Sequence, residues 1–261
     1  IWNIGEWFGE GVETAVDFNF VDIPNVRANL RAQYQYNWTR MGTLHNDEDV
    51  VYDYGYNNYY WPGRPMPSYR DQIILNPDSV GQLPIYSDTL VHRGPTFSLH
   101  QASLGFNFTF FNRITLDAFF TGEAGAILSP ELVRDMTSWG QWQPCFEELE
   151  LINAGDISTL RAETIARCSP DYTGRENWAS RNDYINMQSL TLGLQVPTSW
   201  IESLPISSAL VQLQARNLFT ITHFPGGQPR ALMNTLTQID RAAGWVVPAP
   251  TTVNFNIRLN F

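Results

Sequence analysis

The sequence predicts an all-β fold: an antiparallel transmembrane β-barrel, of which this chain forms an arc of about seven strands. Three observations support this prediction. The last eleven residues, Thr251–Phe261, alternate strictly between apolar and polar side chains and end on a phenylalanine. Six earlier segments repeat the alternation, and the connections between them are short and long in turn. An apolar face toward lipid and a polar face toward a wet lumen are typical of an outer-membrane barrel strand.

The composition fits such a fold and argues against other classes. Of the 261 residues, 43% are hydrophobic and 13% aromatic, while only 16% are charged, well below the usual value of about 25%. Such a chain can build a β-sheet with an aromatic girdle and is not expected to be disordered. The net charge of −10 argues against nucleic acid as a partner, since nucleic acid requires a basic surface. No stretch approaches the ~20 consecutive apolar residues of a membrane-spanning helix.

The first two strands are expected at about Thr14–Val21 and at Val26–Arg40, joined by a turn at Pro24. The second has the longest alternation in the chain, with arginine, asparagine and glutamine on one face. A water-filled lumen accommodates these side chains, whereas each would need a hydrogen-bond partner in the core of a soluble protein. The opposite face changes from small aliphatic residues to aromatic ones toward Trp38, as at the interfacial belt of a barrel.

The remaining strands follow the same pattern. They are expected at Ser98–Phe110, Ile114–Thr121, Asp183–Val196, Ser207–Ile221 and Thr251–Phe261. Two of them are interrupted, because Asn186 and Gln188 fall on the apolar face of one and Asn217 on that of the other.

The connections alternate in length along the chain. The short ones are 23–25, 111–113 and 197–206, and the long ones are 41–96, 128–182 and 222–250. Outer-membrane barrels have short periplasmic turns and long extracellular loops, so we expect the C-terminus in the periplasm and the long excursions outside the cell. We also expect short strands near Val50–Tyr54 and Leu83–His92, and a helix within Cys145–Ile165.

Two groups of side chains stand out in the excursions. Cys145 and Cys168 lie 23 positions apart, and we expect either a disulfide, as in an oxidising compartment, or two free thiols. Aromatic side chains crowd part of the first excursion: Tyr52, Tyr54, Tyr56, Tyr59, Tyr60 and Trp61. This aromatic cluster suits contact with a ligand, since aromatic rings stack on sugars and are favoured at interfaces, but it also suits packing of the loop on itself.

The sequence shows no catalytic set, cofactor motif or metal site. The four histidines are scattered, the two cysteines lack the spacing of a zinc site, and no glycine-rich phosphate loop is present. The acidic residues Glu147, Glu148 and Glu150 are most simply a solvated helix face. We therefore expect no enzymatic activity, no cofactor and no bound metal.

Three segments resemble strands of SusC/RagA-type TonB-dependent outer-membrane receptors. They are Asp183–Gly193, Ala215–Thr222 with its Asn-Leu-Phe-Thr core, and the ending Pro248–Phe261. The segments occur in the family's order, and a proline-containing link joins the first two, as in the family. The resemblance is close over residues 183–261 and extends elsewhere only to the architecture.

The resemblance implies a barrel of about 22 strands with a plugged lumen, in which residues 1–261 are the C-terminal portion and the plug and N-terminal domains lie upstream. It implies uptake of a large ligand such as a glycan or peptide, energised by TonB–ExbB–ExbD through the N-terminal part. A SusD-like surface lipoprotein would act as the lid, and the wall would contact outer-membrane lipid. The residues expected to contact ligand or lipoprotein are Tyr54, Tyr56, Tyr59, Tyr60 and Trp61.

Two alternatives remain open at the level of sequence. A passive, porin-like barrel would have similar strands but no plug and no TonB box. A soluble extracellular β-domain that binds carbohydrate would bury the apolar faces in a compact core, including Leu104, Phe106, Leu192 and Phe255. Such a domain would stay in solution without detergent.

Overall fold

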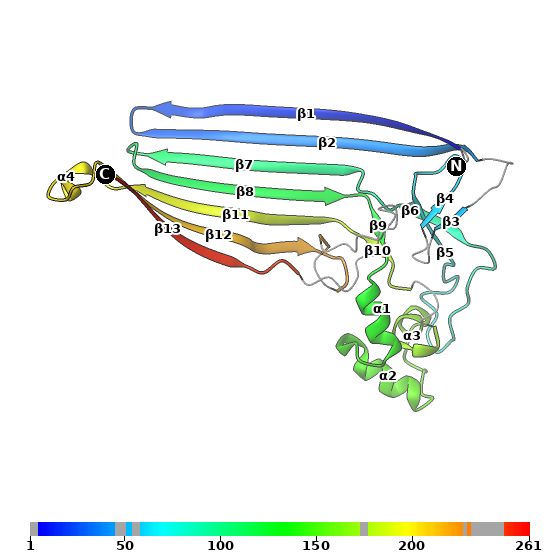
Figure 1. Ribbon diagram of the computed structural model, residues 1–261. Helices are drawn as coiled ribbons and strands as arrows, with labels where there is room; N and C mark the ends of the chain where they lie inside the picture. Colours follow the sequence, from blue (N-terminus) through cyan, green and yellow to red (C-terminus); the bar gives the residue numbers. More distant parts are fainter. Residues whose placement is uncertain (1–4, 45–50, 54–57, 173–176, 227–228, 231–247) are drawn as a thin grey trace.

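A computed structural model describes residues 5–44, 51–53, 58–172, 177–226, 229–230 and 248–261. Its main element is a seven-stranded antiparallel sheet in the order β1-β2-β7-β8-β11-β12-β13, curved into an arc (Figure 1). Its strands are β1 (Gly5–Ile23), β2 (Val26–Leu44), β7 (His100–Phe110), β8 (Ile114–Ala124), β11 (Tyr184–Gln195), β12 (Ser208–Thr222) and β13 (Thr252–Asn260). β1 and β13 each have a single neighbour, so the sheet is open at both edges.

All seven predicted strands are present, and the predicted fold class is confirmed. The first two strands are longer than predicted: β1 begins at Gly5 rather than near Thr14, and β2 ends at Leu44 rather than at Arg40, because the two strands continue to pair over these residues. Glu10 and Thr14, opposite Trp38 and Tyr34, interrupt the apolar alternation there without interrupting the pairing. At ~3.3 Å per residue, a strand of 19 residues is about 60 Å long. That is twice the ~30 Å of a hydrocarbon core, so β1 and β2 are long enough to extend beyond a bilayer.

One face of the sheet is apolar and exposed. Leu192, Leu213 and Phe255 are direct neighbours across β11, β12 and β13, and they are 49%, 47% and 63% exposed. Such exposure shows that no second layer covers this face along these described strands. A continuous exposed apolar surface is the mark of a lipid or protein contact rather than of a soluble core.

The two lengths of connection lie at opposite ends of the sheet. In Figure 1 the β1–β2 and β7–β8 turns, the link that carries α4 (Thr198–Ile201) and the C-terminus gather at one end. The first two long excursions project from the other end. The structure therefore shows the sorting of loops by length that the sequence predicted.

The first excursion folds into a small sheet of four strands, β3 (Val51–Asp53), β4 (Asn58–Tyr60), β5 (Ser68–Asp71) and β6 (Val91–Pro95). β3 agrees with the strand expected near Val50–Tyr54, but of the strand expected at Leu83–His92 only Val91 and His92 are in a strand, at the start of β6. The side chain of Asn76 instead holds the beginning of that stretch, since it donates to the Leu83 carbonyl (3.0 Å) and accepts from the Ile85 amide (2.7 Å). Pro84, between them, has no amide proton to give to a ladder.

The second excursion is mainly helical. It contains α1 (Glu131–Ser138), α2 (Phe146–Asn153) and α3 (Ala162–Cys168), between the short paired strands β9 (Ile127–Leu128) and β10 (Ser180–Arg181). The helix expected within Cys145–Ile165 is thus two helices. α2 stops because Gly155 takes a positive φ of 74° and the Asp156 amide donates back to the Leu151 carbonyl, which is a Schellman termination. Within the described residues, none of the helices combines the length and the apolar character needed to cross a membrane.

Candidate functional site: the polar face and the excursions at its rim

A β-bulge explains the first interruption of the strand pattern. The pairing of β11 with β8 shifts by one residue between Met187 and Ser189, which leaves Gln188 as an extra residue on β11. Against β12 the extra residue is on the other strand, where Asn217 and Leu218 face Gln188 alone. The shift changes the face on which every earlier side chain lies. Asn186 therefore lies opposite Thr220 and Thr121, on the polar face. The expectation that it falls on the apolar face is wrong.

The second interruption, at Asn217, is a backbone irregularity that ties β12 to the start of β13. Asn217 has a φ of 52°, a left-handed conformation that asparagine tolerates better than most residues. Its side-chain amide donates to the Pro250 carbonyl (3.3 Å), and the Thr251 hydroxyl donates to the Asn217 carbonyl (2.8 Å). The amide is thus engaged with the neighbouring backbone.

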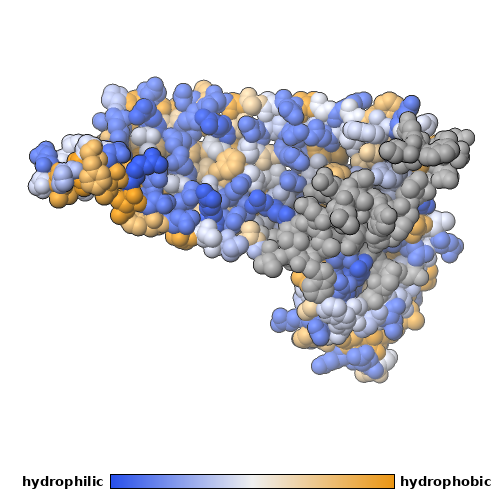
Figure 2. All heavy atoms as spheres, viewed as in Figure 1, coloured by the Kyte–Doolittle hydropathy of each residue, from blue (hydrophilic) through white to orange (hydrophobic). Residues whose placement is uncertain are grey.

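Amides, hydroxyls and a few charges cross-link the strands along the polar face, which Figure 2 shows as predominantly hydrophilic over the sheet. Arg31 pairs with Asp17 at 3.0 Å, and Asn29 donates to both Asp17 and Asn19. The Arg31 and Asp17 side chains are 69% and 53% exposed, so the pair contributes little to stability. The Arg31–Asp17 pair adds charge to the hydrated face of the sheet, opposite the apolar face.

Two adjoining hollows lie on this polar face. One, of about 540 Å³, is lined by Glu13, Gln35, Gln101, Glu123 and Arg230, among others. The other, of about 530 Å³, is lined by Arg31, Asn107, Asp117 and Phe119, among others. Gln33 and Ser103 border both, so the hollows form one polar path along the strands. The sequence pattern did not identify Phe119, which lies on the polar face opposite Gly105.

The third excursion is tied to β11 beside the first of these hollows. Arg230 donates to the Asn186 side-chain oxygen (2.7 Å), and the Asn186 amide donates to the Phe219 carbonyl and the Thr220 hydroxyl. Asn186 is only 1% exposed. Removing the partner of so buried an amide is costly, so this contact should fix where the excursion leaves the sheet.

The aromatic cluster lies partly inside the small sheet of the first excursion. Tyr54 and Tyr56 lie outside the described residues, and the backbone of Tyr52 pairs with that of Tyr59. Tyr59 is 8% exposed, while Tyr60 and Trp61 are half-buried. The contact of these aromatic residues with ligand or lipoprotein stays a prediction, but Tyr59 exposes too little surface to contribute much to such a contact.

Two arginines that the sequence pattern did not identify lie against Trp61. The guanidinium carbon of Arg70 is 4.7 Å from the centre of the Trp61 ring, and that of Arg64 is 5.2 Å away. His92 meets the same ring edge-on at 5.9 Å between ring centres. Partial burial, and then the positive charge of Arg64, hold the pKa of His92 below its ordinary value of 6.5.

We expect the small sheet to lose stability as the pH falls below about 6.5. Because the pKa of His92 is lower in the folded than in the unfolded chain, acid favours the unfolded chain through its greater proton uptake. The stability is complete above the unfolded value and is lost as the pH falls toward the folded one. Hydrogen exchange of the β5 and β6 amides in the intact protein, measured between pH 7 and pH 5, tests this, and His92→Gln should flatten the profile.

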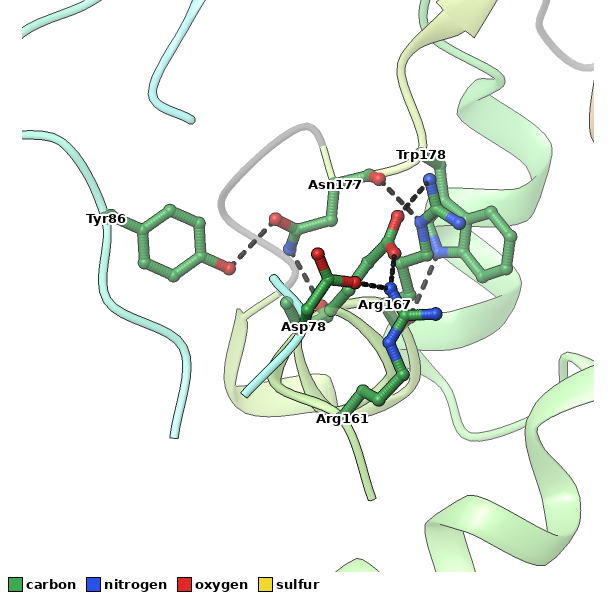
Figure 3. A network of polar contacts seen from close by, with 8 residues as sticks. Asp78, Tyr86, Arg161, Arg167, Asn177 and Trp178 are labelled. Carbon is green, nitrogen blue, oxygen red and sulfur yellow. Dashed lines mark hydrogen bonds and ion pairs between the residues drawn. The ribbon is translucent and has the colours of Figure 1, made fainter. Parts of the chain in front are cut away.

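Polar contacts clamp the first excursion onto the second (Figure 3). Backbone hydrogen bonds join Gly81 to Leu160 (2.9 Å) and Ala162 to Ser79 (2.8 Å), and Arg161 pairs with Asp78. Further along, the Tyr86 hydroxyl donates to the Asn177 side chain at 2.8 Å, and the Asn177 amide donates to the carbonyls of Ala166 (2.8 Å) and Tyr172 (3.0 Å). The two excursions thus form one unit at the rim.

A disulfide closes the helical part of this unit. Cys145, just before α2, is bonded to Cys168, the last residue of α3, with 5.3 Å between their Cα atoms. Both cysteines are buried, at 3% and 5% exposure. The bond joins two cysteines that are 23 positions apart, and Arg161, which contacts the first excursion, lies between them.

Comparison with known proteins shows the fold. Neither a family model nor a curated protein matches the sequence. Among solved structures, the chain matches a chain of the RagAB peptide transporter at 14% identity with a TM-score of 0.72. It also matches chains of the RagAB peptide importer in the open-open state (15%, 0.74) and in the closed-closed state (14%, 0.71).

Each match covers 98 to 99% of this chain but only 29 to 30% of the other, so the chain spans about 30% of the length of the chains it matches. Nearly the whole of the described sheet therefore has a counterpart in a much longer protein. The fold expected from the resemblance to SusC/RagA-type receptors is thereby confirmed: this chain has the fold of a segment of the chains found in the RagAB structures.

Proposed function

We propose that this chain is part of the wall of an outer-membrane β-barrel that imports a large ligand, in a receptor of the SusC/RagA type. The observation that carries the proposal is the single-layer sheet, whose apolar face is exposed while its other face is an amide-lined, hollowed polar surface. Further strands would close the open edges at β1 and β13, since open edges cannot face lipid. The apolar face would then contact lipid and the polar face the lumen.

The excursions would face the outside of the cell, and the short turns and the C-terminus the periplasm. The matched structures are described as a peptide transporter and importer, which favours a peptide over a glycan as the ligand class. We propose that the excursions contact a SusD-like lipoprotein and that TonB–ExbB–ExbD supplies energy through other parts of the receptor. No catalytic step is needed for this role.

Cysteine labelling in intact cells should show this orientation. We expect Thr159→Cys, in the second excursion, to react with a membrane-impermeant maleimide from outside. Ser199→Cys, in the α4 link, should react only after the outer membrane is opened. Both positions are exposed, and the unsubstituted chain, whose cysteines are bonded to each other, is the control. Equal labelling of the two variants in intact cells, or recovery of the protein in the soluble fraction, would contradict the proposal.

A passive porin would also have an exposed apolar face. The dependence of uptake on energy supplied by TonB therefore distinguishes a receptor from a porin. Uptake of a labelled peptide should stop when TonB is removed from the producing strain. Uptake that continues at the same rate without TonB would favour the porin.

A further inference from the structure

Two guanidinium groups lie close together beside the small sheet of the first excursion. Arg64, Arg70 and His92 surround Trp61, although the chain as a whole carries a net charge of −10. Arg70 also lies over Tyr59, at 5.6 Å from its ring centre, and its Nε–H points to the Leu90 carbonyl at 3.5 Å. The aromatic rings therefore hold the guanidinium groups in place, and most of their donors have no hydrogen-bond partner within the described residues.

Arg64 and Arg70 belong to the described arginines that have no carboxylate partner, a group that also includes Arg27, Arg40 and Arg113. Within the described residues no carboxylate lies within ion-pair distance of Arg64 or Arg70. Carboxylates do pair with five other arginines: Arg31, Arg134, Arg161, Arg167 and Arg181. Neighbouring positive groups repel one another, and a bound anion would relieve that repulsion. The buried Nδ1 of His92, which also lacks a hydrogen-bond partner, adds a further polar group to the same place.

The chemistry favours a carboxylate over a neutral sugar. The Trp61 ring already contacts two guanidinium groups, so little of its face remains for a sugar ring to stack on. Arginine has a planar fork of donors that matches a carboxylate, and stacking on an aromatic ring holds that fork in position. Arg64 is exposed and so can be reached from solvent.

We propose that Arg64 and Arg70, held against Trp61, bind a carboxylate of an acidic peptide ligand at the outer rim of the barrel. This inference rests on the proposed import function and specifies its ligand class. The site would select for acidic peptides before they enter the lumen. His92 would stay neutral at neutral pH and leave the charge to the arginines.

The test measures binding to the intact receptor in detergent by calorimetry, with three probes. They are a glutamate-rich hexapeptide, the same peptide with glutamine in place of glutamate, and an oligogalacturonate. We expect the acidic peptide to bind best. Arg64→Gln and Arg70→Gln should each weaken its binding about tenfold or more, because a charged hydrogen bond is lost. Arg64→Lys keeps the charge but not the fork and should recover only part of the affinity.

Arg113→Gln, in the exposed turn at the opposite end of the sheet, is the matched control, since it removes the same charge far from the site. Heat-modifiable migration of each variant checks that the barrel is folded. Equal binding of the acidic peptide by wild type and Arg64→Gln, or no preference for it over its glutamine counterpart, would overturn the inference while leaving the import function intact. Preferential binding of the oligogalacturonate would overturn the peptide assignment. The labelling of Thr159→Cys and Ser199→Cys tests the membrane wall independently of all three probes.

Discussion

Replacing Leu213 by arginine should destabilise the barrel by about 2–4 kcal/mol, the cost of an arginine at the bilayer midplane on the lipid face. Leu213 lies in the middle of β12, between Leu192 and Phe255, and is 47% exposed. In water an exposed leucine could be replaced at little cost. In a bilayer the charge must be drawn toward the interface or remain in hydrocarbon, and either is unfavourable.

The matched control is Gln212→Arg, one residue earlier on the same strand. Gln212 lies opposite Gly193 and Asn256, on the polar face, where an additional arginine meets water and amides. We expect a change of less than ~0.5 kcal/mol, as for surface positions in general. The free energy of unfolding, measured by urea titration of the intact receptor refolded in lipid bilayers, compares the two variants. If both have the same free energy of unfolding, Leu213 does not face lipid.

The strands could be predicted from sequence because period-2 alternation over ten or more residues is a strong signal when one side is wet and the other apolar. A bulge is missed, however, when the alternation is interpreted as one regular strand, because each residue is then assigned the face that it would occupy without the bulge. At Gln188 one extra residue reverses that assignment, which made Asn186 look misplaced. The sequence did contain a signal of this bulge. The apolar residues Ile185 and Met187 occupy odd-numbered positions, whereas Leu190 and Leu192 occupy even-numbered ones.

The excursions were harder to predict for a different reason. β4 and β5 have three and four residues, too few for any periodicity, and their pairing depends on contacts between distant parts of the chain. The arginines around Trp61 illustrate this. Arg70 reaches the ring from β5, and His92 comes from β6, 31 positions further along than Trp61. The sequence could show that aromatic residues are concentrated here, but not which cations would meet them.

Breaking the Cys145–Cys168 bond should destabilise the helical unit locally by about 3 kcal/mol, the chain-entropy value for a closed loop of this length. The bonded segment runs from before α2 to the end of α3, and it includes the Arg161 and Ala162 contacts with the first excursion. The loss of stability should therefore extend to the hydrogen bonds between the two excursions. Hydrogen exchange of the intact receptor should become faster at the Gly81 and Ala162 amides, which bridge the two excursions.

Exchange in the middle of the sheet, for example at Leu192 and Leu213, should not change, because those amides belong to a ladder outside the closed loop. Cys145→Ala, Cys168→Ala and the double variant should show nearly the same effect, since each removes the same bond and the losses cannot add. Reduction of the unsubstituted protein with dithiothreitol keeps both sulfur atoms in place, so it separates loss of the bond from loss of packing at these buried positions. If reduction leaves the Gly81 and Ala162 exchange rates unchanged, the clamp is held by its hydrogen bonds alone and the disulfide does not stabilise it.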